Sequence, residues 1–319
     1  MKKLAVIALG GNAISRSDQI GTIQEQDINV MESLKNIVYM IKEGYNIVLS
    51  HGNGPQVGNI VMRNEAGEQI YNIAQMPLDV CVADSQGGIG YMIERNLRNL
   101  LKQQGLKRDV VTLVTQVLVD KNDPAIHNPS KRIGQIYSKE KALALESSKG
   151  WIFKETSKKK GSYRRVVASP NPIEIFNRDS IARLANEGVI VITVGGGGIP
   201  VYRDDTGMLY PVEGVIDKDM ASSLLAQKIK ADEFYLLTDV PYVYLNYGEE
   251  NQEIAEFLDE NDTLRYLKSG EFGEGSMKPK IEAALEFIQN GGEKSVITES
   301  NKLENRNFGT KITMKYDEG

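Results

Sequence analysis

Two short segments of this 319-residue chain combine lysines with acidic residues or with a predicted helix start. The segment VIDKD places Lys218 between Asp217 and Asp219, directly before a predicted helix. An ammonium group there could offset charge on a moving phosphoryl group, while a carboxylate could orient the lysine or hold Mg²⁺. The segment GSMKPK adds Lys278 and Lys280 at another predicted helix start. Charge alone would also fit solvated surface clusters, so the pattern favours phosphoryl transfer and leaves that alternative open.

Three predicted strands end in glycines, at Gly10, Gly52 and Gly195. Glycine lets main-chain N–H groups approach a ligand closely, and the carboxyl ends of parallel strands meet in the ligand crevice of an open α/β sheet. A helix N-terminus at such a tip also faces an anion favourably. Each tip by itself could be a tight turn, but three of them together indicate an anion-binding site.

The sequence lacks the residues or motifs that several other kinds of functional site require. The histidines are His51 and His127 and the single cysteine is Cys81, so a histidine-rich metal cluster, a histidine relay or a disulfide framework is not expected. GNGPQVG spaces its last glycine one residue too far for a dinucleotide fingerprint, and no segment matches a P-loop. The net charge of −5 argues against binding to duplex nucleic acid. We expect small-molecule partners, no metal site built from side chains, and no nucleic-acid partner.

Apolar patterning predicts the elements that would position these residues. Strand-like runs alternate with segments of helical spacing, which predicts an α/β fold with a mainly parallel sheet covered on both faces. The chain shows neither a membrane-spanning apolar run nor a signal-peptide pattern, and one cysteine fits a reducing cytosol, so a cytoplasmic protein without a membrane partner is expected. The predicted strands are 4–9, 46–50, 109–119, 189–194, one within 232–245 that runs into a turn and, last, 295–298. The predicted helices include about 28–43, 78–103 and 280–288.

Residues 120–172 interrupt this alternation with a polar, proline-containing stretch. We interpret this stretch as a subdomain that protrudes from the sheet. Its basic run includes Lys158, Lys159 and Lys160. These lysines fit a solvated hairpin tip or, alternatively, a lid that contacts phosphate, and their spacing does not distinguish the two.

Eight motifs, in order between about residues 4 and 298, resemble those of the carbamate kinases within the amino-acid kinase superfamily. They are ALGGNA, SHGNGPQVGN, MPLDVCVADSQGGIGYM, TQVLVDKNDPA, YRRVVASPNP, GGGGIP, VIDKDMAS and LTDVPYVYLNYG. The resemblance implies a three-layer αβα sandwich around a mainly parallel open sheet, with a small protruding subdomain. It also implies a homodimer that transfers a phosphoryl group reversibly between ATP, carried with Mg²⁺, and carbamate, giving ADP and carbamoyl phosphate. The implied role is ATP synthesis in arginine or related nitrogen catabolism.

The resemblance also assigns roles along the chain. Residues 1–213, including the protruding subdomain, would bind carbamate or carbamoyl phosphate, and residues 214–319 would bind the nucleotide. The implied catalytic residues are Lys131, Lys218, Asp217, Asp219 and Lys280, with either aspartate orienting the lysines. The implied substrate-binding residues are Gly10, Gly11, Asn12, Gly52, Asn53 and Gly54. The implied nucleotide-binding residues are Thr238, Asp239, Tyr244, Met277 and Lys280.

The sequence departs from related patterns at a few positions. Acetylglutamate kinases have a lysine where this chain has Ala8, so the missing cation would come from Lys131 in the segment NPSK. The family usually continues after that lysine with Pro-Ile-Gly-Pro-Phe, whereas this chain reads RIGQI and gains Arg132. Asp84 and Lys278 also replace residues that are ordinarily uncharged. The altered loop suggests an alternative, a non-catalytic protein of the same fold that binds nucleotide or carbamoyl phosphate for regulation. A sibling kinase that acts on an amino-acid carboxylate is a further alternative, and Ala8 in place of the lysine argues against it.

Overall fold

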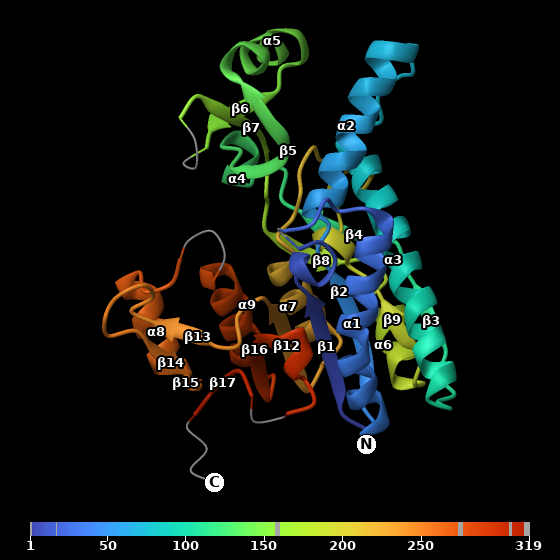
Figure 1. The fold of residues 1–319 in the computed structure, drawn as a ribbon, viewed down its shortest axis with the longest axis vertical. Helices are drawn as coiled ribbons and strands as arrows, with labels where there is room; N and C mark the ends of the chain where they lie inside the picture. The colour runs from blue at the N-terminus through green and yellow to red at the C-terminus, as the bar shows by residue number, and fades with distance from the viewer. Residues whose placement is uncertain (1, 17, 157–159, 274–276, 306–307, 316–319) are drawn as a thin grey trace.

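The computed structural model describes residues 2–16, 18–156, 160–273, 277–305 and 308–315, with the side chains of Asn12 and Asn301 left out (Figure 1). Its centre is an eight-stranded sheet in which neighbours from β16 to β3 run parallel, while β17 is antiparallel to β16. In spatial order the strands are β15 (Phe257–Asp259), β17 (Thr310–Thr313), β16 (Lys294–Glu299), β12 (Glu233–Thr238), β1 (Leu4–Leu9), β2 (Asn46–His51), β9 (Ile190–Ile192) and β3 (Val110–Thr112).

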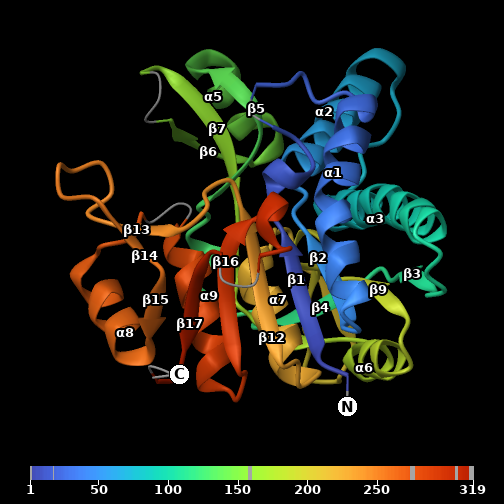
Figure 2. The same ribbon diagram turned by 60° about the horizontal axis from the view of Figure 1, so that its bottom comes forward.

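Helices cover both faces of this sheet, which confirms the three-layer prediction (Figure 2). Side chains alternate along β1: Ile7 packs in the core with α1 and α3, whereas Val6 packs in the core with α6, α7 and α9. Burial on both faces explains why β1 is apolar throughout. The helices are α1 (Ile23–Lys42), α2 (Gly54–Tyr71), α3 (Leu78–Gln103), α4 (Pro124–His127), α5 (Lys139–Lys149), α6 (Arg178–Asn186), α7 (Lys218–Lys228), α8 (Glu260–Ser269) and α9 (Met277–Gln289).

Helix α1 begins at Ile23, earlier than the predicted start near residue 28. The Thr22 hydroxyl accepts a hydrogen bond from the Glu25 backbone N–H at 3.2 Å, and the Glu25 carboxylate accepts one from the Thr22 backbone N–H at 2.8 Å. This reciprocal capping box stabilises the first turn. Apolar periodicity located the buried face of the helix and missed this polar turn.

The single strand predicted at 109–119 is wrong, because the chain divides there into β3 and β4 (Gln116–Val119). The Thr115 backbone N–H donates to Oε1 of Gln86 on α3 at 2.8 Å, so a side chain replaces a neighbouring strand at the break. Strand β4 then joins a second sheet, ordered β11 (Leu209–Pro211), β10 (Ile199–Arg203), β4 and β8 (Pro172–Ile175). The predicted last strand is also followed by another, β17.

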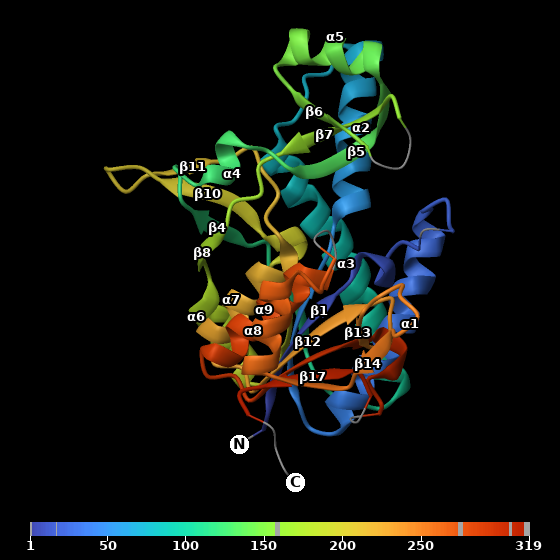
Figure 3. The same ribbon diagram turned by 90° about the vertical axis from the view of Figure 1, so that its left-hand side faces the viewer.

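Between β4 and β8 the chain forms a subdomain that protrudes beside the outer end of α2 (Figures 1 and 3). It contains α4, α5 and an antiparallel sheet of β5 (Lys131–Ser138), β7 (Ser162–Val167) and β6 (Ile152–Glu155). The Tyr137 hydroxyl of β5 donates to Glu65 of α2 at 3.1 Å, which ties the two parts together. Lys160 is exposed in the β6–β7 turn, while Lys158 and Lys159 lie outside the described residues.

Glu233 is a buried acid at the amino-terminal end of β12, far along the strand from the glycine tips. Its carboxylate accepts hydrogen bonds from the hydroxyl groups of Tyr45 and Tyr235, at 3.1 and 2.6 Å, and forms ion pairs with Lys3 and Lys294 at 3.3 and 3.2 Å. Burial would raise the pKa of Glu233, but these partners outweigh it and lower that pKa.

We expect Glu233→Gln to lower the free energy of unfolding by about 2–4 kcal/mol at pH 7, because Lys3 and Lys294 lose the carboxylate with which both form ion pairs. A lowered folded-state pKa gives stability above the ordinary value of 4.5, and that stability is lost as pH falls below it. Denaturant unfolding at pH 7 and pH 4 should therefore show a smaller difference from wild type at pH 4. The exposed Glu250→Gln is the control, and equal losses in both variants would contradict the prediction.

Candidate functional site

The three predicted glycine tips lie together because β1, β2 and β9 are neighbours in the sheet. The Gly52 backbone N–H donates to the Leu9 carbonyl at 3.1 Å. A Cβ atom on Gly10 would lie 2.5 Å from the Leu237 carbonyl oxygen, and one on Gly195 would lie 2.4 Å from His51 Nε2. Glycine therefore allows adjacent strand ends to pack against one another, and the strand ends form one continuous edge.

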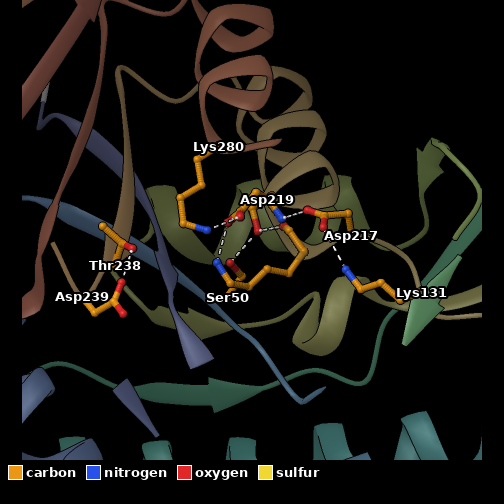
Figure 4. A network of polar contacts seen from close by, with 9 residues as sticks. Ser50, Lys131, Asp217, Asp219, Thr238, Asp239 and Lys280 are labelled. Atoms are coloured by element: carbon orange, nitrogen blue, oxygen red, sulfur yellow. Dashed lines mark hydrogen bonds and ion pairs between the residues drawn. The ribbon is translucent and has the colours of Figure 1, made fainter. Parts of the chain in front are cut away.

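A chain of ion pairs crosses this edge at the start of α7 (Figure 4). Lys131 Nζ lies 2.9 Å from Asp217 Oδ2, while Lys218 and Lys280 Nζ lie 2.5 and 2.9 Å from the two carboxylate oxygens of Asp219. The other oxygen of Asp217 accepts the Asp219 backbone N–H at 2.9 Å and caps the helix. The two aspartates therefore make separate contacts, Asp217 with the subdomain lysine and Asp219 with the other two, a division that the sequence left open.

Lys218, Asp219 and Lys280 are largely buried together, so their charges shift one another's pKa values. Burial alone would raise the pKa of the Asp219 carboxyl, but the ammonium groups of Lys218 and Lys280 hold that pKa well below its usual range. Burial lowers the pKa of Lys218 against the opposing effect of Asp219. For Lys280 burial acts in the same direction, yet the contact with Asp219 outweighs it and raises the pKa. Asp219 thus keeps two cations together at one point.

Two residues that the sequence analysis did not single out fix the start of α7. The Ser50 and Ser222 hydroxyl oxygens lie 2.6 Å apart, and Ser222 donates to the Lys218 carbonyl at 2.6 Å. This contact links β2 to α7. His51 is buried beside the glycines, and burial, together with the nearby Lys218 charge, lowers its pKa to about 4. A neutral His51 packs the strand ends and adds no charge to the site.

A pocket of about 500 Å³ opens on one side of this cluster. It takes in all five residues predicted to bind nucleotide, and it adds Tyr247, Phe272 and Glu271, which the sequence analysis missed. The available signal was the aromatic residues of YVYLNYG, inside the last of the eight motifs, and of EFG, which lies outside them. The residues that line this larger pocket are Gly10, Gly11, Lys218, Leu237, Thr238, Asp239, Val240, Tyr244, Tyr247, Glu271, Phe272, Gly273, Met277 and Lys280.

A smaller pocket of about 300 Å³ opens on the other side, beneath the protruding subdomain. It shares Gly11, Lys218 and Lys280 with the larger pocket, so the two meet at these residues. Its remaining lining includes Gly52, Asn53, Gly54, Pro55, Val57, Lys131, Arg132, Ile133, Gly196, Val215, Ile216, Asp217, Asp219 and Pro279. A charged junction between two cavities can hold two ligands end to end with their reacting groups at the shared residues.

The predicted substrate-binding residues divide unevenly between these pockets. Gly11, Gly52 and Gly54 line the smaller pocket, whereas Gly10 lines the larger one. Asn53 borders the smaller pocket but is 3% exposed, and its Nδ2 donates to Ser85 at 2.8 Å. Its amide nitrogen therefore supports the strand end. Asn12 belongs to a short turn after β1, and its side chain lies outside the described residues.

Lysines already bind the carboxylates of Asp217 and Asp219. Among the described residues, no group of three or more histidine, cysteine, aspartate or glutamate side chains is placed to hold a metal ion. The lysines instead suit phosphate oxygens, which could themselves hold a divalent cation. In the part of the chain that the structure describes, no helix has the length and apolar character needed to cross a bilayer.

Comparisons with known proteins agree on one family. Residues 3–299 match the amino acid kinase family. The carbamate kinase of Pyrococcus furiosus is 45% identical over 95% of this chain and 95% of its own length. The structure of Giardia lamblia carbamate kinase bound to AMP-PNP is similar with a TM-score of 0.91 and 39% identity, covering 98% of each chain. A protein of Aeropyrum pernix K1 matches with a TM-score of 0.92 and 39% identity, covering 98% of this chain and all of that one.

Proposed function

Because this chain belongs to the amino acid kinase family and, within it, to the carbamate kinases, we propose that it transfers a phosphoryl group reversibly between ATP and carbamate. The products are ADP and carbamoyl phosphate. The observation that carries the proposal is the pair of pockets that meet at Gly11, Lys218 and Lys280. A nucleotide in the larger pocket and a small anion in the smaller one would place the transferred group at that junction.

The larger pocket has the chemistry for a nucleotide along its whole length. Tyr244 and Met277 offer apolar surface for the base and sugar, and Lys218 and Lys280 lie at the phosphate end. A similar protein binds AMP-PNP, which supports ATP as the ligand. Mg²⁺ would enter on the nucleotide phosphates, since lysines already hold Asp217 and Asp219, and there it would offset phosphate charge.

The smaller pocket would hold carbamate against the main-chain groups of Gly52 and Gly54. A carbamate oxygen would attack the terminal phosphorus of ATP while the bond from that phosphorus to the bridging oxygen breaks, so ADP leaves and no covalent enzyme intermediate forms. Both reactants are anions, and the ammonium groups of Lys131, Lys218 and Lys280 reduce their repulsion as the phosphoryl group moves. Asp219 holds two of these groups, and Asp217 holds Lys131.

Lys131 reaches the site from the protruding subdomain. Lys131 already lies beside Asp217, so closure of the subdomain over the smaller pocket would enclose the substrate and exclude water from carbamate and carbamoyl phosphate, which are both labile in water. We further propose that residues 1–213 form the carbamate-binding lobe and residues 214–319 the nucleotide-binding lobe. A cytoplasmic homodimer that makes ATP in nitrogen catabolism is part of the same proposal.

The test is ATP formation from ADP, Mg²⁺ and carbamoyl phosphate, with Lys131→Ala beside wild type. We expect Lys131→Ala to lower kcat by about 10²–10³-fold, because one positioned cation is lost from the transition state. Lys160→Ala, on the same subdomain but exposed in the β6–β7 turn, should leave kcat unchanged.

Two results would contradict the proposal in different ways. Turnover by Lys131→Ala close to that of wild type would remove the role of the subdomain lysine. A folded wild-type protein that binds ATP but forms none from carbamoyl phosphate would instead favour the non-catalytic regulatory alternative.

A further inference from the structure

Arg132 is a second cationic residue, besides Lys131, that the protruding subdomain contributes to the lining of the smaller pocket. It follows Lys131 at the start of β5, and both residues line that pocket. The next residue, Ile133, is 2% exposed and packs with α2 and α3, while Arg132 itself is exposed. The anchored neighbour fixes the backbone from which the Arg132 side chain extends.

Arg132 differs from the other cations of the pocket in its contacts. Lys131 is paired with Asp217, and Lys218 and Lys280 share Asp219. The Arg132 guanidinium has no hydrogen-bond or ion-pair partner among residues 2–16, 18–156, 160–273, 277–305 and 308–315. Four cations and two carboxylates therefore line this pocket, which leaves an excess of two positive charges, and the exposed Arg132 carries one of them.

The surroundings of Arg132 also favour an anion over a further cation. Burial and the nearby Arg132 charge lower the pKa of the Arg164 guanidinium. Arg164 is itself bound to the Gly134 carbonyl at 2.8 Å, so it is directed into the subdomain. Arg132, unlike Arg164, lines the smaller pocket. A planar guanidinium matches carboxylate and phosphate oxygens with two parallel hydrogen bonds.

We propose that Arg132 is a substrate-binding residue that holds the oxygens of the small anionic substrate in the smaller pocket. This inference rests on the proposed function and deepens it, because it assigns different tasks to two adjacent cations. Lys131, fixed by Asp217, acts on the transferring group. Arg132, which has no such partner, pairs with oxygens of the bound carbamoyl phosphate or carbamate before the reaction, and it raises the affinity of the smaller pocket for that anion.

The experiment compares Arg132→Gln, Arg132→Lys and wild type in steady-state ATP synthesis at saturating ADP. Loss of a charge-assisted hydrogen bond should raise the KM for carbamoyl phosphate about tenfold in Arg132→Gln, with kcat within about twofold of wild type. Arg132→Lys should recover part of that loss, and the KM for ADP should not change. The matched control is Lys154→Gln, an exposed cation on β6 of the same subdomain that lies outside both pockets.

A KM within about twofold of wild type in Arg132→Gln, or the same increase in Lys154→Gln, would overturn the inference. Calorimetric titration of each protein with carbamoyl phosphate, without ADP or Mg²⁺, measures binding without turnover. It therefore tests the role of Arg132 independently of the proposed kinase activity. Weaker binding by Arg132→Gln supports the assignment even where wild type forms no ATP, and equal binding overturns it even where wild type is an active kinase. Circular dichroism checks that each variant is folded.

Discussion

Lys218→Ala is expected to form ATP at least about 10³-fold more slowly than wild type while the protein stays folded. Lys218 lines both pockets, and its side chain is 12% exposed with Nζ 2.5 Å from Asp219. An ammonium at the junction acts on the group in transit, so its loss should reduce kcat far more than the affinity for ADP. The measurement is kcat for ATP synthesis together with the dissociation constant of ADP.

The same helix supplies the control for this variant. Lys228 lies at the last turn of α7 and is exposed, so Lys228→Ala changes the net charge equally without touching either pocket. A decrease in kcat of less than about tenfold in Lys218→Ala would place the transferring group elsewhere.

Asp219→Asn should lower the free energy of unfolding by about 3–5 kcal/mol at pH 7, because removing one partner leaves two buried ammonium groups uncompensated. The lowered pKa of Asp219 fixes the sign of the pH dependence. Its contribution is fully present above the ordinary value of 3.8 and is lost as pH falls below it toward the folded-state pKa. Denaturant unfolding of both proteins at pH 7 and at pH 3 measures this difference.

Activity gives a second readout for Asp219→Asn. The carboxylate raises the pKa of Lys218 against the effect of burial, so its removal should lower that pKa further. The alkaline limb of the kcat profile should then move to lower pH. The exposed Asp205→Asn should change neither stability nor this limb. An unchanged alkaline limb in Asp219→Asn would show that the Lys218 charge does not depend on Asp219.

Local sequence patterns predicted much of the candidate site. The glycine tips followed from apolar runs that end in residues without side chains, and the segment 215–219 followed from a lysine between carboxylates. The partners of those residues did not follow. Lys131 and Asp217 are 86 positions apart, and Lys280 and Asp219 are 61 apart. Spacing along the chain carries no information about such pairs.

The same distinction applies to the fold. The sequence by itself determined the buried strands, the layered α/β architecture and the protruding stretch, because hydrophobic periodicity and proline act locally. The tertiary structure alone decided the break between β3 and β4, since Gln86 of α3 takes the place of a strand partner there. It also decided that Asp219 binds two lysines while Asp217 binds the subdomain lysine, and that Arg132 faces the smaller pocket with its charge unmatched. Those outcomes depend on distances set by packing of remote elements, and charge energies vary steeply with distance and burial.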